Sequence, residues 1–471
     1  MDKSIKYNQI TKRDIDFFTE LVGIENLLTG LNCKNFGSDH TENLNYPPEL
    51  VVFPQSTNDV SKILSYCNAN LIPVTPSAAL TGLSGGAIPV HGGISLSMKK
   101  MNKIISIDNK NFQATIEPGL INEDFQNKLK ELNLFYPPDP ASKGSCTLGG
   151  NFALNAGGPK AIKYGVTSNY VINLEIVLPS GNVFWTGANT LKNATGYNLT
   201  QLIIGSEGTL AIITQAVVRL LPIPVHKTLM LIPFFNNVHA CDAVAKIMHD
   251  GIIPSSIEFM EKDAILFVKE KEYANIPFNI DNDDKSYLLI ELDGANKDEL
   301  FQEAIKINQI TQDYDCGEVL FADTIEEQEK LWKVRRSIGL AVKAHSIYKE
   351  EDTVVPRANL SKLLSGVKAI GNKYSFKSIC YGHAGDGNLH VNILKEGLDD
   401  HKWNHILDEA IREIFQLCVD LGGTISGEHG IGFVQKKYMD IPFCENNLKV
   451  QKEIKTIFDP NRILNPGKIF E

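Results

Sequence analysis

Two stretches of small residues constrain this chain more than any other feature of its sequence. The first is Pro76-Ser-Ala-Ala-Leu-Thr-Gly-Leu-Ser-Gly-Gly-Ala87, and the second, about 60 residues later, runs from Tyr136-Pro-Pro-Asp-Pro-Ala-Ser142 through Cys146-Thr-Leu-Gly-Gly-Asn-Phe-Ala-Leu-Asn-Ala-Gly-Gly158. Small residues let backbone N–H groups approach and surround phosphate oxygens. The pair therefore indicates a site for one extended ligand with a pyrophosphate, and two unrelated surface loops are the alternative.

The first stretch matches neither of two common nucleotide-binding motifs. No Gly-Lys-Ser/Thr follows the first stretch, so it is not a P-loop. A strand-like run at 94–98 follows it, where a Rossmann fingerprint requires a helix.

Composition and charge exclude several classes of protein. The 471 residues suggest two to four domains at roughly 100–200 residues each. The net charge of −10 argues against a nucleic-acid partner. The longest apolar run, 229–235, is far too short to cross a membrane, and the first residues have no apolar core, so no secretory signal is expected.

The cysteine pattern predicts the cellular compartment of the protein. The eight cysteines form no Cys-x-x-Cys pair, which excludes the usual zinc-ribbon, thioredoxin and ferredoxin patterns. Scattered thiols predict a cytoplasmic protein, with a peripheral position at the inner membrane face as a further option.

The chain changes character at Pro222-Ile-Pro224. Strands are predicted before it at 94–98, 104–107, 113–117, 171–178 and 209–220, with a helix at 122–133, while 136–165 is expected to have little regular structure. After it, strands at 227–233, 286–292, 379–382 and 389–394 alternate with helices at 236–250, 296–312 and 402–420, the pattern of an α+β domain. The predicted segments are 1–45 (helical), 46–222, 223–425 and 426–471.

Two further stretches carry histidines and a glutamate among glycines. In Tyr381-Gly-His-Ala-Gly-Asp-Gly-Asn-Leu-His-Val-Asn-Ile393 a flexible turn separates His383 from His390, and Gly422-Gly-Thr-Ile-Ser-Gly-Glu-His-Gly-Ile-Gly432 contains Glu428 and His429. Two imidazoles and one carboxylate are a credible set of ligands for a divalent metal, with positions left for a substrate. Hydrogen-bonded core histidines are the alternative.

Together with Gly205-Ser-Glu-Gly-Thr-Leu210 and Asn465-Pro-Gly-Lys468, the two loops resemble the FAD-linked oxidase family with the vanillyl-alcohol-oxidase-type flavin fold. The remainder is similar to its branch of D-lactate, glycolate and D-2-hydroxyglutarate dehydrogenases, from about Tyr46 to Lys468. The resemblance implies an α+β protein with a two-subdomain FAD-binding domain (46–222), a substrate or cap domain with an antiparallel sheet (223–425) and a C-terminal segment returning to the flavin (426–471). Covalent-flavin members use a histidine in the first loop, and here that loop holds none before His91, so the FAD is expected to be non-covalent.

The resemblance also implies site residues. The metal ligands are His383, His390 and Glu428, with zinc as the expected ion, and His429 is the general base. Arg335, Lys349 and Asn392 bind the substrate, although for Arg335 and Lys349 an exposed helix charge is the alternative. The residues expected to bind FAD are Pro76, Ser77, Ala78, Ala79, Leu80, Thr81, Gly82, Leu83, Ser84, Gly85, Pro138, Asp139, Ser142, Thr147, Gly149, Gly150, Asn151, Asn155, Gly157, Gly158, Gly165, Glu207, Gly208, Ile212 and Asn465.

The implied reaction is oxidation of a 2-hydroxy acid, with hydride transfer to the flavin. No iron–sulfur motif is present, so electrons are expected to pass to an external quinone, cytochrome, electron-transfer flavoprotein or partner subunit. Lys349 and Asn392 resemble the hydroxyglutarate branch, whereas Ala384 is also common in the glycolate and lactate branch. A metal-dependent hydrolase without flavin and a flavin-binding subunit of a larger complex are the rival interpretations, and a homodimer is one option for assembly.

Overall fold

The computed structural model describes residues 6–470, and the chain forms two compact units. The first unit contains the chain up to Ala156, then Val166–Ile223 and Glu428 onward. The second contains Gly157–Gly165 and Pro224–Gly427. The excursion of Gly157–Gly165 into the second unit is not something the sequence predicts.

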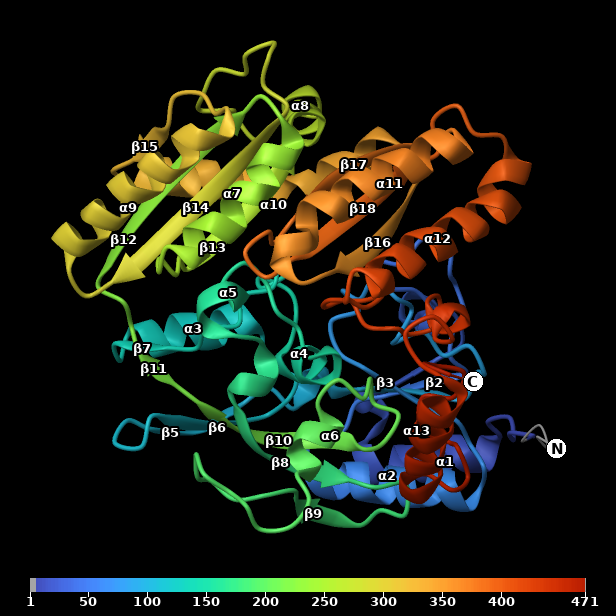
Figure 1. Ribbon diagram of the computed structural model, residues 1–471. Helices are drawn as coiled ribbons and strands as arrows, with labels where there is room; N and C mark the ends of the chain where they lie inside the picture. The colour runs from blue at the N-terminus through green and yellow to red at the C-terminus, as the bar shows by residue number, and fades with distance from the viewer. Residues whose placement is uncertain (1–5, 471) are drawn as a thin grey trace. The chain divides into compact units, whose positions relative to one another are not determined.

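The first unit begins with a small sheet in the order β1-β2-β4-β3. Its strands are β1 (Leu27–Thr29), β2 (Leu50–Val52), β3 (Val74–Ser77) and β4 (Ile94–Ser97). The last three are parallel and β1 is antiparallel to β2. Helices α1 (Lys12–Val22) and α2 (Thr57–Ala69) lie side by side (Figure 1). Their residues Phe18, Ile63 and Leu64 belong to the same core as these strands.

A second, antiparallel sheet completes this unit in the order β5-β6-β10-β8-β9. Its strands are β5 (Ile104–Asp108), β6 (Gln113–Ile116), β8 (Val171–Val177), β9 (Val183–Trp185) and β10 (Ile212–Arg219). Helices α3 (Asn122–Lys130), α6 (Leu199–Ile203) and α13 (Glu445–Phe458) also belong to this unit, as does the short pair β7 (Leu134–Phe135) and β11 (Leu221–Pro222). The two sheets match the two subdomains that the resemblance implies.

The expectation of little regular structure over 136–165 is wrong. Helix α4 (Leu148–Leu154) and the short α5 (Ala161–Tyr164) lie within it. Thr147 caps α4 by accepting a hydrogen bond from Gly150 N–H at 3.4 Å. A Cβ on Gly149 would lie 2.5 Å from Pro118 Cβ, so this glycine serves close packing rather than flexibility.

The second unit is built on a seven-stranded sheet in the order β15-β12-β14-β13-β17-β18-β16. Every neighbouring pair in it is antiparallel, which confirms the predicted antiparallel sheet. The strands are β12 (His226–Phe234), β13 (Ser256–Glu261), β14 (Ser286–Gly294), β15 (Leu320–Ala322), β16 (Tyr348–Val354), β17 (Lys377–Gly382) and β18 (Asn388–Leu394).

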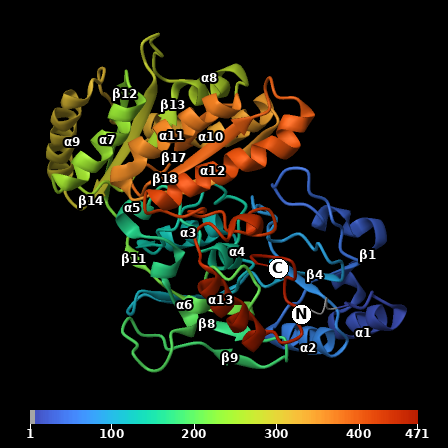
Figure 2. The ribbon, with the colours of Figure 1, turned by 45° about the vertical axis from the view of Figure 1, so that its right-hand side comes forward.

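Helices cover both faces of this sheet. On one face, α8 (Lys262–Glu270) and α10 (Ile325–His345) pack with Met260, Leu289 and Tyr381 into one apolar core. The other helices of the unit are α7 (Asn237–His249), α9 (Lys297–Thr311), α11 (Leu360–Tyr374) and α12 (Leu407–Asp420). Figure 2 shows α11 beside β17 and β18, and α12 packs against α11 and β16. Among the described residues, no helix combines the length and the apolar character needed to cross a membrane.

Candidate active site

His383, Glu258 and Arg335 form a buried, charged cluster in the second unit. His383 follows β17, Glu258 lies on β13 and Arg335 lies on α10. The His383 Nδ1 atom is 2.8 Å from Glu258 Oε1, and Arg335 Nη2 is 2.6 Å from Glu258 Oε2. Burial alone would raise the pKa of Glu258, but the charges of His383 and Arg335 hold it below its usual value. Glu258 therefore fixes the orientation of both neighbours.

The two histidines are placed as a metal-binding pair would require. Their rings meet edge to face with centroids 5.4 Å apart, and a ring nitrogen of each lies within 4.8 Å of one on the other. Because Nδ1 of His383 faces a carboxylate, its Nε2 is the atom that offers a lone pair to a metal. A carboxylate that orients an imidazole in this way is the usual support for a metal-bound histidine. The donor set thus fits a divalent ion.

Two buried polar side chains beside this pair have unused hydrogen-bonding atoms. Arg335 is 6% exposed and its Nε has no hydrogen-bond partner in the described structure. Asn392 on β18 is fully buried, and neither its Nδ2 nor its Oδ1 has one. The Asn392 amide still lies near enough to the Tyr381 hydroxyl to oppose part of the rise that burial causes in the pKa of Tyr381. Buried donors and acceptors are rarely left unsatisfied, so these atoms point to a polar ligand.

Strand alternation separates Lys349 from this cluster. On β16, Glu350 pairs across the sheet with Asn392 and Asp352 pairs with His390, so these four side chains share a face. Lys349 pairs with Ile393 and points to the opposite face, where its Nζ lies 3.4 Å from the Trp403 carbonyl oxygen. The predicted substrate-binding residues Arg335 and Asn392 are therefore on one face of the sheet and Lys349 is on the other.

Asp352 anchors the chain directly before Glu428. Its Oδ2 accepts hydrogen bonds from Gly427 N–H at 2.8 Å and from Ser426 Oγ at 2.9 Å. Its Oδ1 accepts a hydrogen bond from Asn388 Nδ2 at 2.7 Å. Chain connectivity keeps the Glu428 Cα about 3.8 Å from that of Gly427. Asp352 therefore fixes the position of the backbone at Gly427, the residue directly before Glu428.

Glu207 anchors the chain directly after His429, within the first unit. Its two carboxylate oxygens accept hydrogen bonds from Ile431 N–H and Gly432 N–H, each at 2.8 Å. Burial raises the pKa of Glu207 to about 7, although these donors and Lys468 oppose the rise. Gly430 has φ +77°, which supplies the irregular backbone that adjacent Glu428 and His429 need if both are to serve one site.

The first small-residue loop is built like a phosphate cradle. Within the described structure, no backbone N–H of residues 79–84 donates a hydrogen bond to another protein group. The loop is held from behind: Gly85 N–H donates to Thr41 Oγ1 at 2.7 Å, and Ser84 Oγ donates to the His429 carbonyl oxygen at 3.0 Å. A run of unused N–H groups on a loop of small residues fits a pyrophosphate.

Asn465 joins this loop to the 205–208 turn. Its Nδ2 donates to the carbonyl oxygens of Gly86 and Glu207, both at 2.8 Å, and its buried Oδ1 has no partner in the described structure. The same turn is tied to α4, because Gly205 N–H donates to Phe152 O and Glu207 N–H donates to Ala153 O, each at 2.9 Å. Three of the predicted FAD-binding segments are therefore one hydrogen-bonded assembly.

The other residues predicted to bind FAD are dispersed over several elements. Pro138, Asp139 and Ser142 lie in the loop before α4, and Ile212 begins β10. Asn155 caps the end of α4 with φ +54° and its Oδ1 accepts a hydrogen bond from Ser168 N–H. Gly157, Gly158 and Gly165 belong to the excursion into the second unit.

Sequence reasoning missed three acidic residues of the site: Glu258, Glu350 and Asp352. Glu258 lies in the otherwise mostly apolar strand Ser-Ile-Glu-Phe-Met-Glu. A carboxylate in such a strand indicates a buried charge that needs a partner, and it could have been found from the sequence. Glu350 and Asp352 lie in the acidic run directly after Lys349, and the sequence analysis assigned a role only to the lysine.

Comparisons with known proteins identify the family and the fold. Residues 48–187 match the FAD binding domain family, and residues 223–469 match the family of FAD linked oxidases, C-terminal domain. The fold is shared with p-cresol methylhydroxylase with substrate bound, at a TM-score of 0.80 and 18% identity over 98% of each chain. Fold and matched families define an FAD-dependent oxidoreductase of the vanillyl-alcohol-oxidase type.

The chain belongs to the FAD-linked oxidase family. It is 37% identical to the glycolate oxidase subunit GlcD of Bacillus subtilis over 92% of each chain. It is 34% identical to D-lactate dehydrogenase of Anaerostipes hadrus over 98% of each chain. It is also 31% identical to D-2-hydroxyglutarate dehydrogenase of Stutzerimonas stutzeri, over 97% of this chain and 98% of the relative.

Proposed function

We propose that this enzyme is an FAD-dependent dehydrogenase that oxidises a D-2-hydroxy acid to the 2-oxo acid and passes the electrons to an external acceptor. The observation that carries the proposal is the unsatisfied Arg335 Nε and Asn392 amide beside the two histidines. A carboxylate and a hydroxyl on neighbouring carbons would satisfy an arginine, an amide and a metal at once. The names of the relatives support the same class of substrate.

FAD and a divalent ion, with zinc as the expected metal, would supply the hydride acceptor and the acidification of the substrate hydroxyl. His383, His390 and Glu428 would hold the ion, and the unused N–H groups of residues 79–84 with Asn465 would hold the FAD non-covalently. Arg335 would orient the substrate carboxylate through its Nε–H. His429 would accept the hydroxyl proton as general base.

The test is flavin bleaching under anaerobic conditions. The purified protein should be yellow. D-lactate, glycolate or D-2-hydroxyglutarate should bleach the flavin when no acceptor is present, and should support turnover when an artificial dye is added as the acceptor. Arg335→Lys should raise KM more than it lowers kcat, because an ammonium ion lacks the planar fork that grips a carboxylate. A colourless protein that cannot be reconstituted with FAD, or one that no 2-hydroxy acid reduces, contradicts the proposal.

A further inference from the structure

Glu350 lies on the proposed substrate face of the sheet, where the sequence led us to expect a lysine. It pairs across the strands with Asn392, and its Oε1 lies 3.7 Å from His390 Nδ1. Its side chain is only 12% exposed. The alternation of β16 that brings Glu350 to this face takes Lys349 to the other, where it lies near Trp403 and Asp408.

The charges on this face are mainly negative. Glu258, Glu350 and Asp352 contribute carboxylates, and Arg335 contributes one guanidinium, which already forms an ion pair with Glu258. Lys160, in the same unit, forms an ion pair with Glu291 at 2.7 Å. A divalent ion and Arg335 can balance one substrate carboxylate. A second substrate carboxylate would meet carboxylates on this face.

The charge of Glu350 also affects the pKa of a neighbouring side chain. Tyr381, 5% exposed, has a pKa raised well above its usual value, first by burial and next by the charge of Glu350. Charges only a few ångströms apart in a half-buried site interact far more strongly than they do in water. An anionic substituent on the substrate would experience the same field.

We infer that Glu350 selects a 2-hydroxy acid with a single carboxylate and an uncharged remainder, and rejects a dicarboxylic one. This inference rests on the proposed function and narrows it. D-lactate and glycolate satisfy the requirement. D-2-hydroxyglutarate does not, because its second carboxylate would carry the same charge as the Glu350 carboxylate that lies 3.7 Å from His390 on this face.

The experiment compares kcat/KM for D-lactate and D-2-hydroxyglutarate in the holoenzyme, with a dye as electron acceptor. The native enzyme should favour D-lactate by roughly 100-fold or more, the scale of one like-charge contact in a partly buried site. Glu350→Gln, which removes that contact, should shift the ratio toward D-2-hydroxyglutarate by about 100-fold, and Glu350→Lys, which replaces repulsion by attraction, should shift it further. Glu453→Lys, which makes the same charge change on the exposed surface of α13, should leave the ratio unchanged.

Each outcome separates the inference from the proposed function. Reduction by D-2-hydroxyglutarate as fast as by D-lactate overturns the inference and leaves the proposed function standing. Loss of bound metal from Glu350→Gln, measured by metal analysis with FAD retained, overturns it as well, because Glu350 would then be a ligand. Failure of every 2-hydroxy acid to reduce the flavin overturns the proposed function and this inference with it.

Discussion

Glu258, Asp352 and Glu207 each hold two or more groups of the candidate site. Glu258 contacts His383 and Arg335, Asp352 accepts hydrogen bonds from Asn388, Ser426 and Gly427, and Glu207 accepts them from two consecutive N–H groups. A buried carboxylate is costly unless such partners surround it. At the scale of single residues, therefore, these three carboxylates hold the side chains and backbone of the candidate site in position and are not themselves assigned a chemical step.

Replacing His429 tests the proposed base directly. His429→Asn should retain FAD and metal, because its backbone anchors, Ser84 and Glu207, are untouched. Flavin reduction by substrate should slow by about 10²–10⁴-fold, the usual contribution of a general base. Rapid-mixing absorbance measures this step separately from reoxidation. An unchanged bleaching rate would show that His429 is structural.

At the scale of elements, β17 and β18 form a rigid support for two of the proposed metal ligands. His383 directly follows β17 and His390 lies within β18, and the two strands pair in an antiparallel ladder. The FAD-binding loops, in contrast, lie around β3 and α4 of the first unit. The metal and the flavin should therefore be separable.

Metal removal exploits this separation. Treatment with a chelator should abolish dehydrogenation while the yellow flavin remains bound, and added zinc should restore activity. Metal analysis before and after dialysis, with a flavin spectrum at each stage, makes the measurement. Full activity in a preparation shown to contain no metal would refute the metal site.

The turn after His429 depends on Glu207 as a clamp. In Glu207→Gln the side-chain amide has one acceptor oxygen, so one of the Ile431 and Gly432 N–H groups loses its partner. An unsatisfied buried donor costs about 1–3 kcal/mol, so hydrogen exchange at these two amides should accelerate roughly 5- to 100-fold. Glu453→Gln, at an exposed position, is the matched control. Equal protection of both amides in the variant and the native protein would contradict the clamp.

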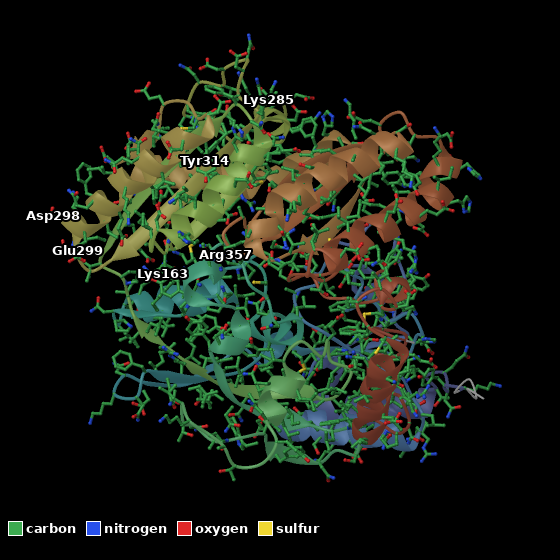
Figure 3. All side chains as sticks on the ribbon, viewed as in Figure 1. Lys163, Lys285, Asp298, Glu299, Tyr314 and Arg357 are labelled. Carbon is green, nitrogen blue, oxygen red and sulfur yellow. The ribbon has the colours of Figure 1, made fainter. Side chains whose placement is uncertain are left out.

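At the scale of the whole molecule, Gly157–Gly165 leaves the first unit to join the second. It is fastened there by Lys160 to Glu291 at 2.7 Å and by Lys163 to Asp293 at 2.7 Å. Figure 3 labels Lys163 on α5. Trp332 Nε1 also donates to Glu291 Oε2 at 2.9 Å. The excursion is therefore a charged attachment rather than a free loop.

This attachment predicts a pH dependence. Burial alone would raise the pKa of Glu291, but Lys160, Lys227 and Trp332 together lower it from 4.5 to about 2. Because the folded state lowers this pKa, the stabilisation is fully present above pH 4.5 and is lost as pH falls toward 2. Glu291→Gln should therefore lower the free energy of unfolding at pH 7 by about 3 kcal/mol.

The difference in the free energy of unfolding between the native protein and Glu291→Gln should shrink steadily as pH falls from 4.5 toward 2. Urea unfolding at a series of pH values measures this difference. Glu409→Gln, at an exposed position on α12, controls for the loss of one charge. A difference that stays constant with pH would show that the pair does not carry the stabilisation.

Local composition was enough to predict much of this protein. The small-residue loops, the His383–His390 turn and the Glu428-His429 dipeptide are recognisable because their chemistry depends on short-range backbone freedom. The antiparallel sheet of the second unit followed from the resemblance, and four of its seven strands were predicted from the sequence. The helix α4 was missed because capping by Thr147 and packing of Gly149 on Pro118 outweigh a composition typical of loops.

Only the tertiary structure decided which side chains share a face. The period of a strand shows that Lys349 and Glu350 point in opposite directions, but not which of them faces His390 and Asn392. That choice depends on the register of β16 with β18 and on the helices that cover each face, both of which are long-range pairings. The partners of Glu258, Asp352 and Glu207 are set in the same way, because residues far apart in the chain become neighbours only when the sheets and loops assemble.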